Sequence, residues 1–183
     1  VMWHEVAPRL ARHFHVICPD LRGYGDSSKP SSRPDHYPYS KRAMARDMVE
    51  VMAALGYAEF FVAGHDRGAR VTHRMALDSP EKIIKACVMD IAPTYHMFRN
   101  TDQHFATGYY HWFFLIQPDG LPEHLIGAAP AYFLKEKLKR WSAPGATFPD
   151  EAVAEYVRCF SQPESIHASC EDYRAAASID LQH

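Results

Sequence analysis

The order of apolar and polar positions along the chain predicts alternating strands and helices. Apolar residues recur at helical spacing over residues 40–55 and again over residues 67–80. Short, continuously apolar segments flank these helices and predict buried strands. They are "HVICPDL" (15–21), "EFFVAG" (59–64) and "IIKACVMDI" (83–91). Strands that alternate with helices at these intervals predict a mostly parallel sheet with crossover helices.

The pattern changes after Pro93. No further continuously apolar strand occurs, and aromatic-rich segments with helical spacing follow, such as "TGYYHWFFL", "AYFLKEKLKRW" and "DEAVAEYVRCF". Open sheets place their ligands beyond the carboxyl ends of the strands, where a helical insertion can cover them. We therefore expect a central core at residues 1–92 and a helical cap at residues 93–183.

Composition narrows the functional classes. The chain has 183 residues, 47% of them apolar and 23% charged, with a formal net charge of −2. This balance excludes a basic face for nucleic acid, and no apolar run is long enough to span a membrane. The four cysteines are widely spaced, which predicts free, mostly buried thiols in a reducing, cytoplasmic compartment. The twelve histidines lack metal-ligand spacing, so we expect no metal.

The segment "GHDRG", residues 64–68, joins the second predicted strand to the following helix. Gly-x-x-x-Gly around a central residue is typical of a nucleophile elbow, in which small glycines let the backbone turn sharply. Here the central residue is Asp66. A carboxylate in that position can displace a leaving group from an sp3 carbon and form an ester on the enzyme. The alternative is that Asp66 only caps the helix.

Two arginines follow the elbow. Arg67 and Arg70 lie three residues apart, so they share a face of the predicted helix. Two cations beside a nucleophile favour an anionic substrate, most simply a carboxylate held by both nitrogens of a guanidinium. Arginines in a first helical turn are otherwise usually solvated or paired with surface acids.

Taken together, these motifs resemble the fluoroacetate (haloacetate) dehalogenases of the α/β-hydrolase superfamily. The resemblance rests on "DLRGYGDSSKP", "GHDRGARV", "MDIAPTY", "YHWFFL" and "CEDYRA", and it extends along the whole chain. It implies an α/β-hydrolase fold with an inserted helical cap. It also implies a haloacid substrate, water as co-substrate, no cofactor and a homodimer. The preferred haloacid does not follow from the sequence.

The resemblance implies a role for each matching residue. Asp66 would attack the carbon that bears the halogen, and Asp90 would orient the catalytic histidine that activates water. Arg67 and Arg70 would bind the carboxylate of the substrate. His111, Trp112 and Tyr173 would donate hydrogen bonds to the departing halide, and Trp141 would line the pocket. Taken singly, His111 is slightly better explained as a buried core residue, and Tyr173 is more often a core or interface residue than a ligand. Asp90 alone could be a cap at the end of a strand.

Two parts of the family pattern have no counterpart in the sequence. These are the "HGFP"-like loop, which would precede Val1, and the general-base histidine, which would follow the last residue. His183 lies too early for that role. We therefore expect the chain to lack the first and last strands of the fold, and to be unable to complete a catalytic cycle by itself.

Two other functions remain open from the sequence. An epoxide hydrolase would use the same aspartate with tyrosine donors from the cap, and four tyrosines are available there: Tyr109, Tyr110, Tyr132 and Tyr173. Arg67 argues against it, because epoxides are commonly neutral. The second alternative is a protein that binds ligands on a hydrolase scaffold without catalysis.

Overall fold

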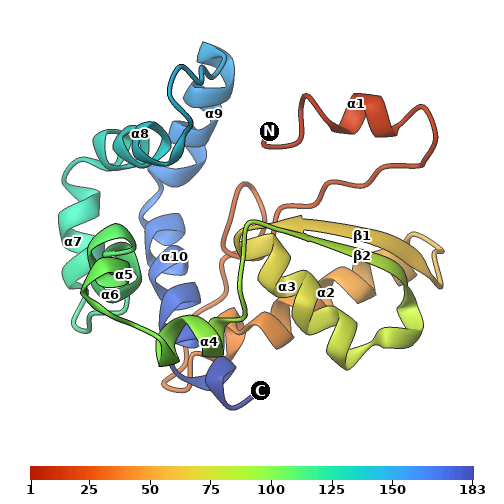
Figure 1. Cartoon of the computed structure of the whole chain (residues 1–183), viewed down its shortest axis with the longest axis horizontal. Helices are drawn as coiled ribbons and strands as arrows, with labels where there is room; N and C mark the ends of the chain where they lie inside the picture. The colour runs from red at the N-terminus through yellow and green to blue at the C-terminus, as the bar shows by residue number, and fades with distance from the viewer. The chain divides into compact units, whose positions relative to one another are not determined.

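The computed structural model describes all residues, 1–183, in two compact units (Figure 1). The first unit comprises residues 1–29 and 120–168, and the second comprises residues 30–119 and 169–183. The elements are α1 (Ala7–Leu10), η1 (Tyr37–Tyr39), α2 (Lys41–Ala54), β1 (Phe60–His65), α3 (Arg67–Asp78), η2 (Pro80–Lys82), β2 (Ile83–Met89), α4 (Thr94–Arg99), α5 (Gln103–Gly108), α6 (His111–Phe114), α7 (Leu121–Gly127), α8 (Pro130–Trp141), α9 (Asp150–Phe160), α10 (Pro163–Ala176) and η3 (Ile179–Leu181).

The second unit contains the sheet. β1 and β2 pair in parallel, from Phe61 opposite Lys85 to His65 opposite Met89, with an irregularity between Phe60 and Phe61. This confirms the strands that were predicted over residues 59–64 and 83–91. The crossover between them is α3, as parallel pairing requires.

Helices α2 and α3 supply the core of this unit. α3 packs against both strands and against α2 (Figure 1). Their inward faces bury Met44, Val71 and Met75 almost completely. The side chain of Ser40 caps α2 by accepting a hydrogen bond from the Ala43 N–H at 3.2 Å. Both helices that the apolar spacing predicted are therefore present, with α2 at Lys41–Ala54 and α3 at Arg67–Asp78.

The predicted strand at residues 15–21 is wrong. These residues have no regular secondary structure, and the sheet consists of β1 and β2 alone. An apolar run of this length indicates burial, whereas a strand exists only where a second backbone completes the hydrogen-bond ladder. In the described chain no segment forms that ladder with residues 15–21.

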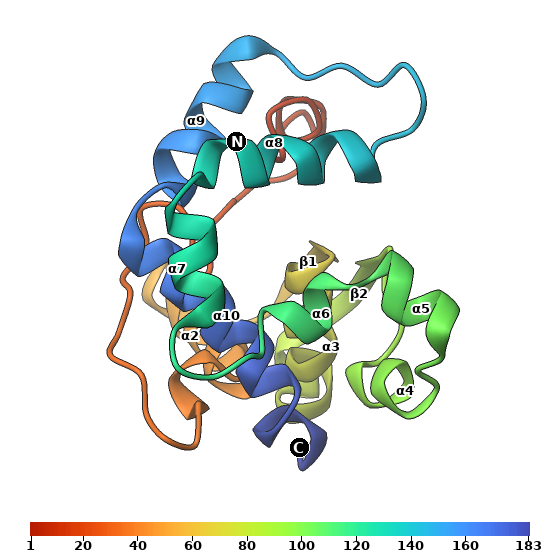
Figure 2. The same cartoon turned by 90° about the vertical axis from the view of Figure 1, so that its left-hand side faces the viewer.

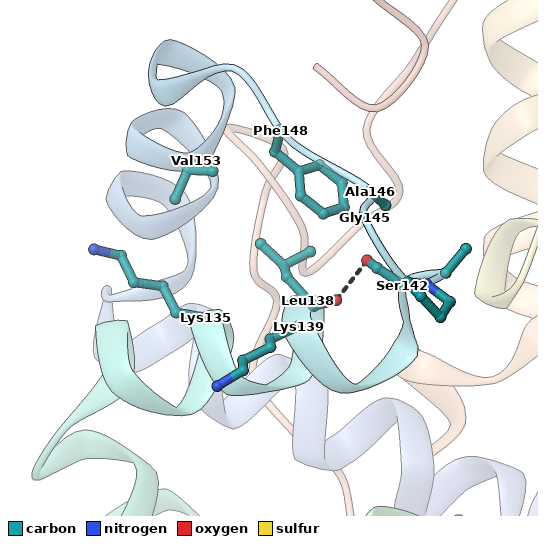
Figure 3. A pocket seen from close by; sticks show the side chains of 10 residues that line it. Lys135, Leu138, Lys139, Ser142, Gly145, Ala146, Phe148 and Val153 are labelled. Carbon is teal, nitrogen blue, oxygen red and sulfur yellow. Dashed lines mark hydrogen bonds between the residues drawn. The ribbon is translucent and has the colours of Figure 1, made fainter.

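Beyond β2 the chain is helical, as predicted. Short helices α4, α5 and α6 follow β2 in the second unit, and Figure 2 shows the long loop that joins α8 to α9 in the first. A cavity of about 480 Å³ lies between that loop and the two helices, where Ser142 donates a hydrogen bond to the Leu138 carbonyl at 2.6 Å (Figure 3). None of the residues predicted for the active site lines it.

The compact units do not coincide with the predicted division at residue 92. Residues 93–119 and 169–183 belong to the same unit as the strands. The assignment of residues 1–92 to a hydrolase core and residues 93–183 to a cap therefore stays a prediction. The four cysteines are free, as expected, although only Cys170 is buried. No helix combines the length and the apolarity needed to cross a membrane.

Candidate active site

Asp66 occupies a strained turn between β1 and α3. Its backbone has φ 47° and ψ −117°, which a residue with a side chain rarely adopts. The Asp66 N–H donates to the Met89 carbonyl of β2 at 3.2 Å, and the Asp66 carbonyl accepts from the Arg70 N–H at 3.1 Å. Its carboxylate makes no capping hydrogen bond to α3. The turn thus has the sharp geometry of an elbow, and the alternative of a simple helix cap is not supported.

Gly64 lets β1 and α3 approach closely enough to form this turn. A Cβ added to Gly64 would lie 2.4 Å from the Gly68 carbonyl oxygen and 2.5 Å from the Thr72 hydroxyl. Gly68 differs, because an added Cβ there would meet no atom within 4 Å. The expectation that both glycines permit the turn therefore holds for Gly64 alone.

Gly64→Ala is expected to destabilise the whole protein that carries this chain by about 1–3 kcal/mol, because the new methyl group must displace backbone. Chemical denaturation measures the effect. Gly127→Ala is the matched control, since its Cβ would meet nothing within 4 Å at the end of α7. This control should be neutral or stabilising by up to about 1 kcal/mol. Equal stability of the two variants would show that the close approach does not constrain the turn.

Arg67 is buried and bound to Asp172, an acid that was not among the predicted site residues. Its Nε donates to Asp172 Oδ2 at 2.7 Å, and its Nη2 donates to Oδ1 at 2.6 Å and to the Asp172 carbonyl at 3.1 Å. Lys41 Nζ also donates to Asp172 Oδ1. Burial alone would raise the pKa of the Asp172 carboxyl, but the charges of Arg67 and Lys41 outweigh burial and hold it well below its ordinary value.

Arg70 is the second buried guanidinium beside the elbow. Its Nη1 donates to the Ala92 carbonyl at 2.7 Å and to the Thr94 hydroxyl at 3.1 Å, whereas its buried Nε has no partner. Burial and then the charge of Arg67 lower the pKa of Arg70 to about 10. Arg70 is therefore still a cation at neutral pH, and an anion bound beside it would relieve the cost of burying its charge.

Aromatic rings cover both guanidinium groups. The Arg67 Cζ lies 4.2 Å from the ring centroid of Tyr173, and the Arg70 Cζ lies 4.6 Å from that of Trp112. The Tyr173 ring meets His111 and Trp112 edge-on, with centroids 5.5 and 6.0 Å apart. His111, Trp112 and Tyr173 are all buried. The structure thus brings five of the predicted substrate-binding residues together in one cluster.

The other two predicted residues lie differently. Asp90 follows β2, with φ 58°, and its Oδ2 lies 3.6 Å from His65 Nε2. Its carboxylate is 82% exposed, so it is accessible to a group from outside the described chain. Trp141 ends α8 in the first unit, where the Lys137 Nζ lies 4.6 Å from its ring centroid. Its predicted place in the pocket wall stays a prediction.

The groups that hold the two arginines were not predicted from the sequence: the Asp172 carboxylate and carbonyl, the Ala92 carbonyl and the Thr94 hydroxyl. Asp172 lies within "CEDYRA", from which only Tyr173 was predicted as a site residue. The one local feature that could have indicated Asp172 is its position immediately before that tyrosine. Thr94 and Ala92 lie within "IAPTY", where nothing in the sequence indicates an arginine partner. These contacts join residues that are far apart in sequence, and the spacing of apolar residues along the chain cannot predict them.

The family model for the alpha/beta hydrolase fold matches residues 1–173. The chain belongs to the α/β-hydrolase family. A crystal structure of an α/β hydrolase from Nostoc sp PCC 7120 superposes with a TM-score of 0.98 at 63% identity, covering 100% of this chain and 62% of that one. These matches confirm the α/β-hydrolase fold that the resemblance implied.

Two curated proteins that are similar to the chain are hydrolases. A fluoroacetate dehalogenase from Burkholderia sp is 50% identical over 182 residues, covering 99% of this chain and 60% of that protein. A soluble epoxide hydrolase from Corynebacterium sp. (strain C12) is 32% identical over 186 residues, covering 99% and 63%. These matches confirm the resemblance to the dehalogenases. The chain spans about three fifths of the length of both relatives.

Proposed function

We propose that the whole protein is a hydrolytic dehalogenase acting on a short 2-haloacid such as fluoroacetate. The observation that carries the proposal is the position of Arg70, a buried cation whose Nε has no hydrogen-bond partner. It lies one helical turn after Asp66, whose carboxylate makes no capping hydrogen bond to α3. An anionic group can pair with Arg70 while the carbon next to that group lies near the nucleophile. The 50% identity to a fluoroacetate dehalogenase supports the same assignment.

In the proposed mechanism, an Asp66 carboxylate oxygen attacks the carbon that bears the halogen. The carbon–halogen bond breaks as the new carbon–oxygen bond forms, and its electron pair leaves with the halide. The product is an ester between Asp66 and the acid. A water molecule then attacks the carbonyl carbon of this ester, which regenerates the Asp66 carboxylate and releases a 2-hydroxyacid and a proton.

The buried aromatic cluster is suited to the departing halide. His111, Trp112 and Tyr173 carry N–H and O–H groups, and we propose that these donate to the halide. Fluoride is small and strongly hydrated, so fixed donors in a water-excluding site would replace the hydration as negative charge develops. Burial raises the pKa of Tyr173, so its hydroxyl keeps its proton at neutral pH and remains a donor.

The remaining predicted residues keep the roles that the resemblance implies. Arg67 adds positive charge beside Arg70, although its Nε and Nη2 are engaged by Asp172. Asp90 is proposed to orient a histidine from outside the described chain, for which its exposed carboxylate is accessible. Trp141 is proposed to line the pocket of the whole protein, which we expect to act as a homodimer.

Epoxide hydrolysis is the second candidate, favoured by the 32% identity to a soluble epoxide hydrolase. It uses the same nucleophile but needs tyrosine donors. Of the four cap tyrosines, only Tyr173 is buried, whereas Tyr109, Tyr110 and Tyr132 are 45%, 43% and 69% exposed. A neutral epoxide also carries no negative charge to pair with the buried Arg70 cation, whose Nε has no hydrogen-bond partner. Both observations favour the haloacid.

The test is halide release by the whole protein from fluoroacetate, chloroacetate and bromoacetate, beside diol formation from styrene oxide. We expect sustained halide release and no diol. Mass spectrometry after rapid quenching should show the chain increased by the mass of the carboxymethyl group that the substrate leaves as an ester, on the peptide that contains Asp66. Diol formation without halide release would favour the epoxide hydrolase, and silence on both would favour a non-catalytic binding protein.

A further inference from the structure

We propose that Asp172 is a positioning residue, which fixes Arg67 and through Arg67 sets Tyr173 in the active site. The inference rests on the proposed function, in which Tyr173 donates to the departing halide. It adds to that function a residue that contacts neither the substrate nor the nucleophile.

The Asp172 carboxylate holds the Arg67 guanidinium in one orientation. It is 0% exposed and accepts from two nitrogens of Arg67, at 2.7 and 2.6 Å, while the Asp172 carbonyl accepts from Nη2 at 3.1 Å. Two parallel bonds fix the plane of a guanidinium, and the third bond restrains its position within that plane. The guanidinium side chain therefore has little freedom to rotate.

Tyr173 rests on the group that Asp172 fixes. The two residues are neighbours on α10, so Asp172 binds the edge of the Arg67 guanidinium while the Tyr173 ring lies 4.2 Å from its Cζ. The same ring meets His111 and Trp112 edge-on. A displacement of Arg67 would therefore move the surface against which Tyr173 packs, and with it the hydroxyl that is proposed to meet the halide.

The contacts of Lys41 allow the positioning of Arg67 by Asp172 to be tested separately from the neutralisation of a buried positive charge by an acid. Its Nζ contacts both Asp172 and Asp180, the latter at 3.4 Å, and its backbone N–H donates to Asp180 Oδ1 at 2.9 Å. Both acids are thus buried partners of the same lysine, but only Asp172 contacts Arg67. Asp180→Asn is accordingly the matched control for Asp172→Asn.

The experiment compares halide release from fluoroacetate and bromoacetate by the whole protein and its variants. Asp172→Asn is expected to lower kcat/KM for fluoroacetate by about 100-fold, the scale of loss when a reacting group is misplaced by about 1 Å. The loss on bromoacetate should be about tenfold smaller, because bromide leaves readily and depends less on a donor. Tyr173→Phe should lower the fluoroacetate-to-bromoacetate ratio by the same factor. Asp180→Asn should leave the ratio unchanged.

Circular dichroism establishes that each variant folds. If Asp172→Asn fails to fold, the double variant Arg67→Met with Asp172→Asn removes the uncompensated buried charge, and its ratio should fall as far as that of Tyr173→Phe. An unchanged ratio in folded Asp172 variants, or an equal fall in Asp180→Asn, would overturn the positioning role while leaving the proposed function in place. No halide release by the unmodified protein would overturn both.

Discussion

Asp66→Asn is expected to lower halide release by the whole protein by about 10⁴-fold or more. An amide cannot act as the anionic nucleophile, and removal of a catalytic nucleophile commonly costs this much or more. The expectation rests on the elbow, where the carboxylate is presented without a capping bond to α3. Because the amide has nearly the same shape, folding should not change. The measurement is fluoride release over many turnovers, together with mass spectrometry for the ester.

Asp78→Asn is the control for that variant. Asp78 ends the same helix and pairs with Arg42 and Arg74, so it tests the loss of an aspartate from α3 away from the elbow. Its halide release should stay within about threefold of the unmodified protein, as expected of a partly exposed ion pair. Sustained turnover by Asp66→Asn would exclude Asp66 as the nucleophile, and a water molecule attacking the substrate directly would then be the simplest mechanism.

Arg70→Ala is expected to lower kcat/KM for chloroacetate by roughly 10²- to 10³-fold. Loss of one partner from a buried, hydrogen-bonded charge pair costs about 2–5 kcal/mol, which corresponds to roughly 30- to 4,000-fold, and the expected loss lies in the middle of that range. Most of the loss should appear in KM, because the substrate carboxylate interacts with Arg70 before and during the displacement. The same assay with chloroacetamide provides the decisive comparison. This neutral analogue has no carboxylate, so the substitution should change its turnover little.

Arg74→Ala is the control for the arginine. Arg74 lies one turn further along α3 and binds Asp78 and the His183 carbonyl. Its loss should reduce stability without a preference for the charged substrate. If Arg70→Ala slowed chloroacetate and chloroacetamide equally, its effect would come from the Ala92 and Thr94 contacts that order the chain after β2, and not from recognition of the carboxylate.

Local signals in the sequence predicted most of the described fold. Met44, Met48 and Met52 are spaced four residues apart, so they lie on one face of a helix, and this local pattern is enough to predict α2. The elbow likewise lies within a few residues, so its strand, turn and helix were all predictable. Residues 15–21 show the limit of such reasoning. Their apolar character is local, but strand formation depends on a partner segment elsewhere, which no window of sequence contains.

The candidate site shows the same limit more strongly. The resemblance named His111, Trp112 and Tyr173, and the structure gathers them beside Arg67 and Arg70. The acid that organises Arg67 was not predicted, because it lies 105 residues away along the chain. Pairings over such separations are decided by the folded topology. From sequence, an arginine reserved for substrate and an arginine already bound to a buried carboxylate look alike.

The strained backbone of the two aspartates that follow β1 and β2 has a consequence for the stability of this protein. Asp66 and Asp90 both have positive φ, 47° and 58°, a conformation that burdens a residue with a Cβ by about 1–3 kcal/mol. Glycine, which has no Cβ, would relieve that strain at either position. Under the proposed function, replacing either aspartate would gain stability at the expense of activity, so engineering for stability should draw its gains from positions outside these two turns.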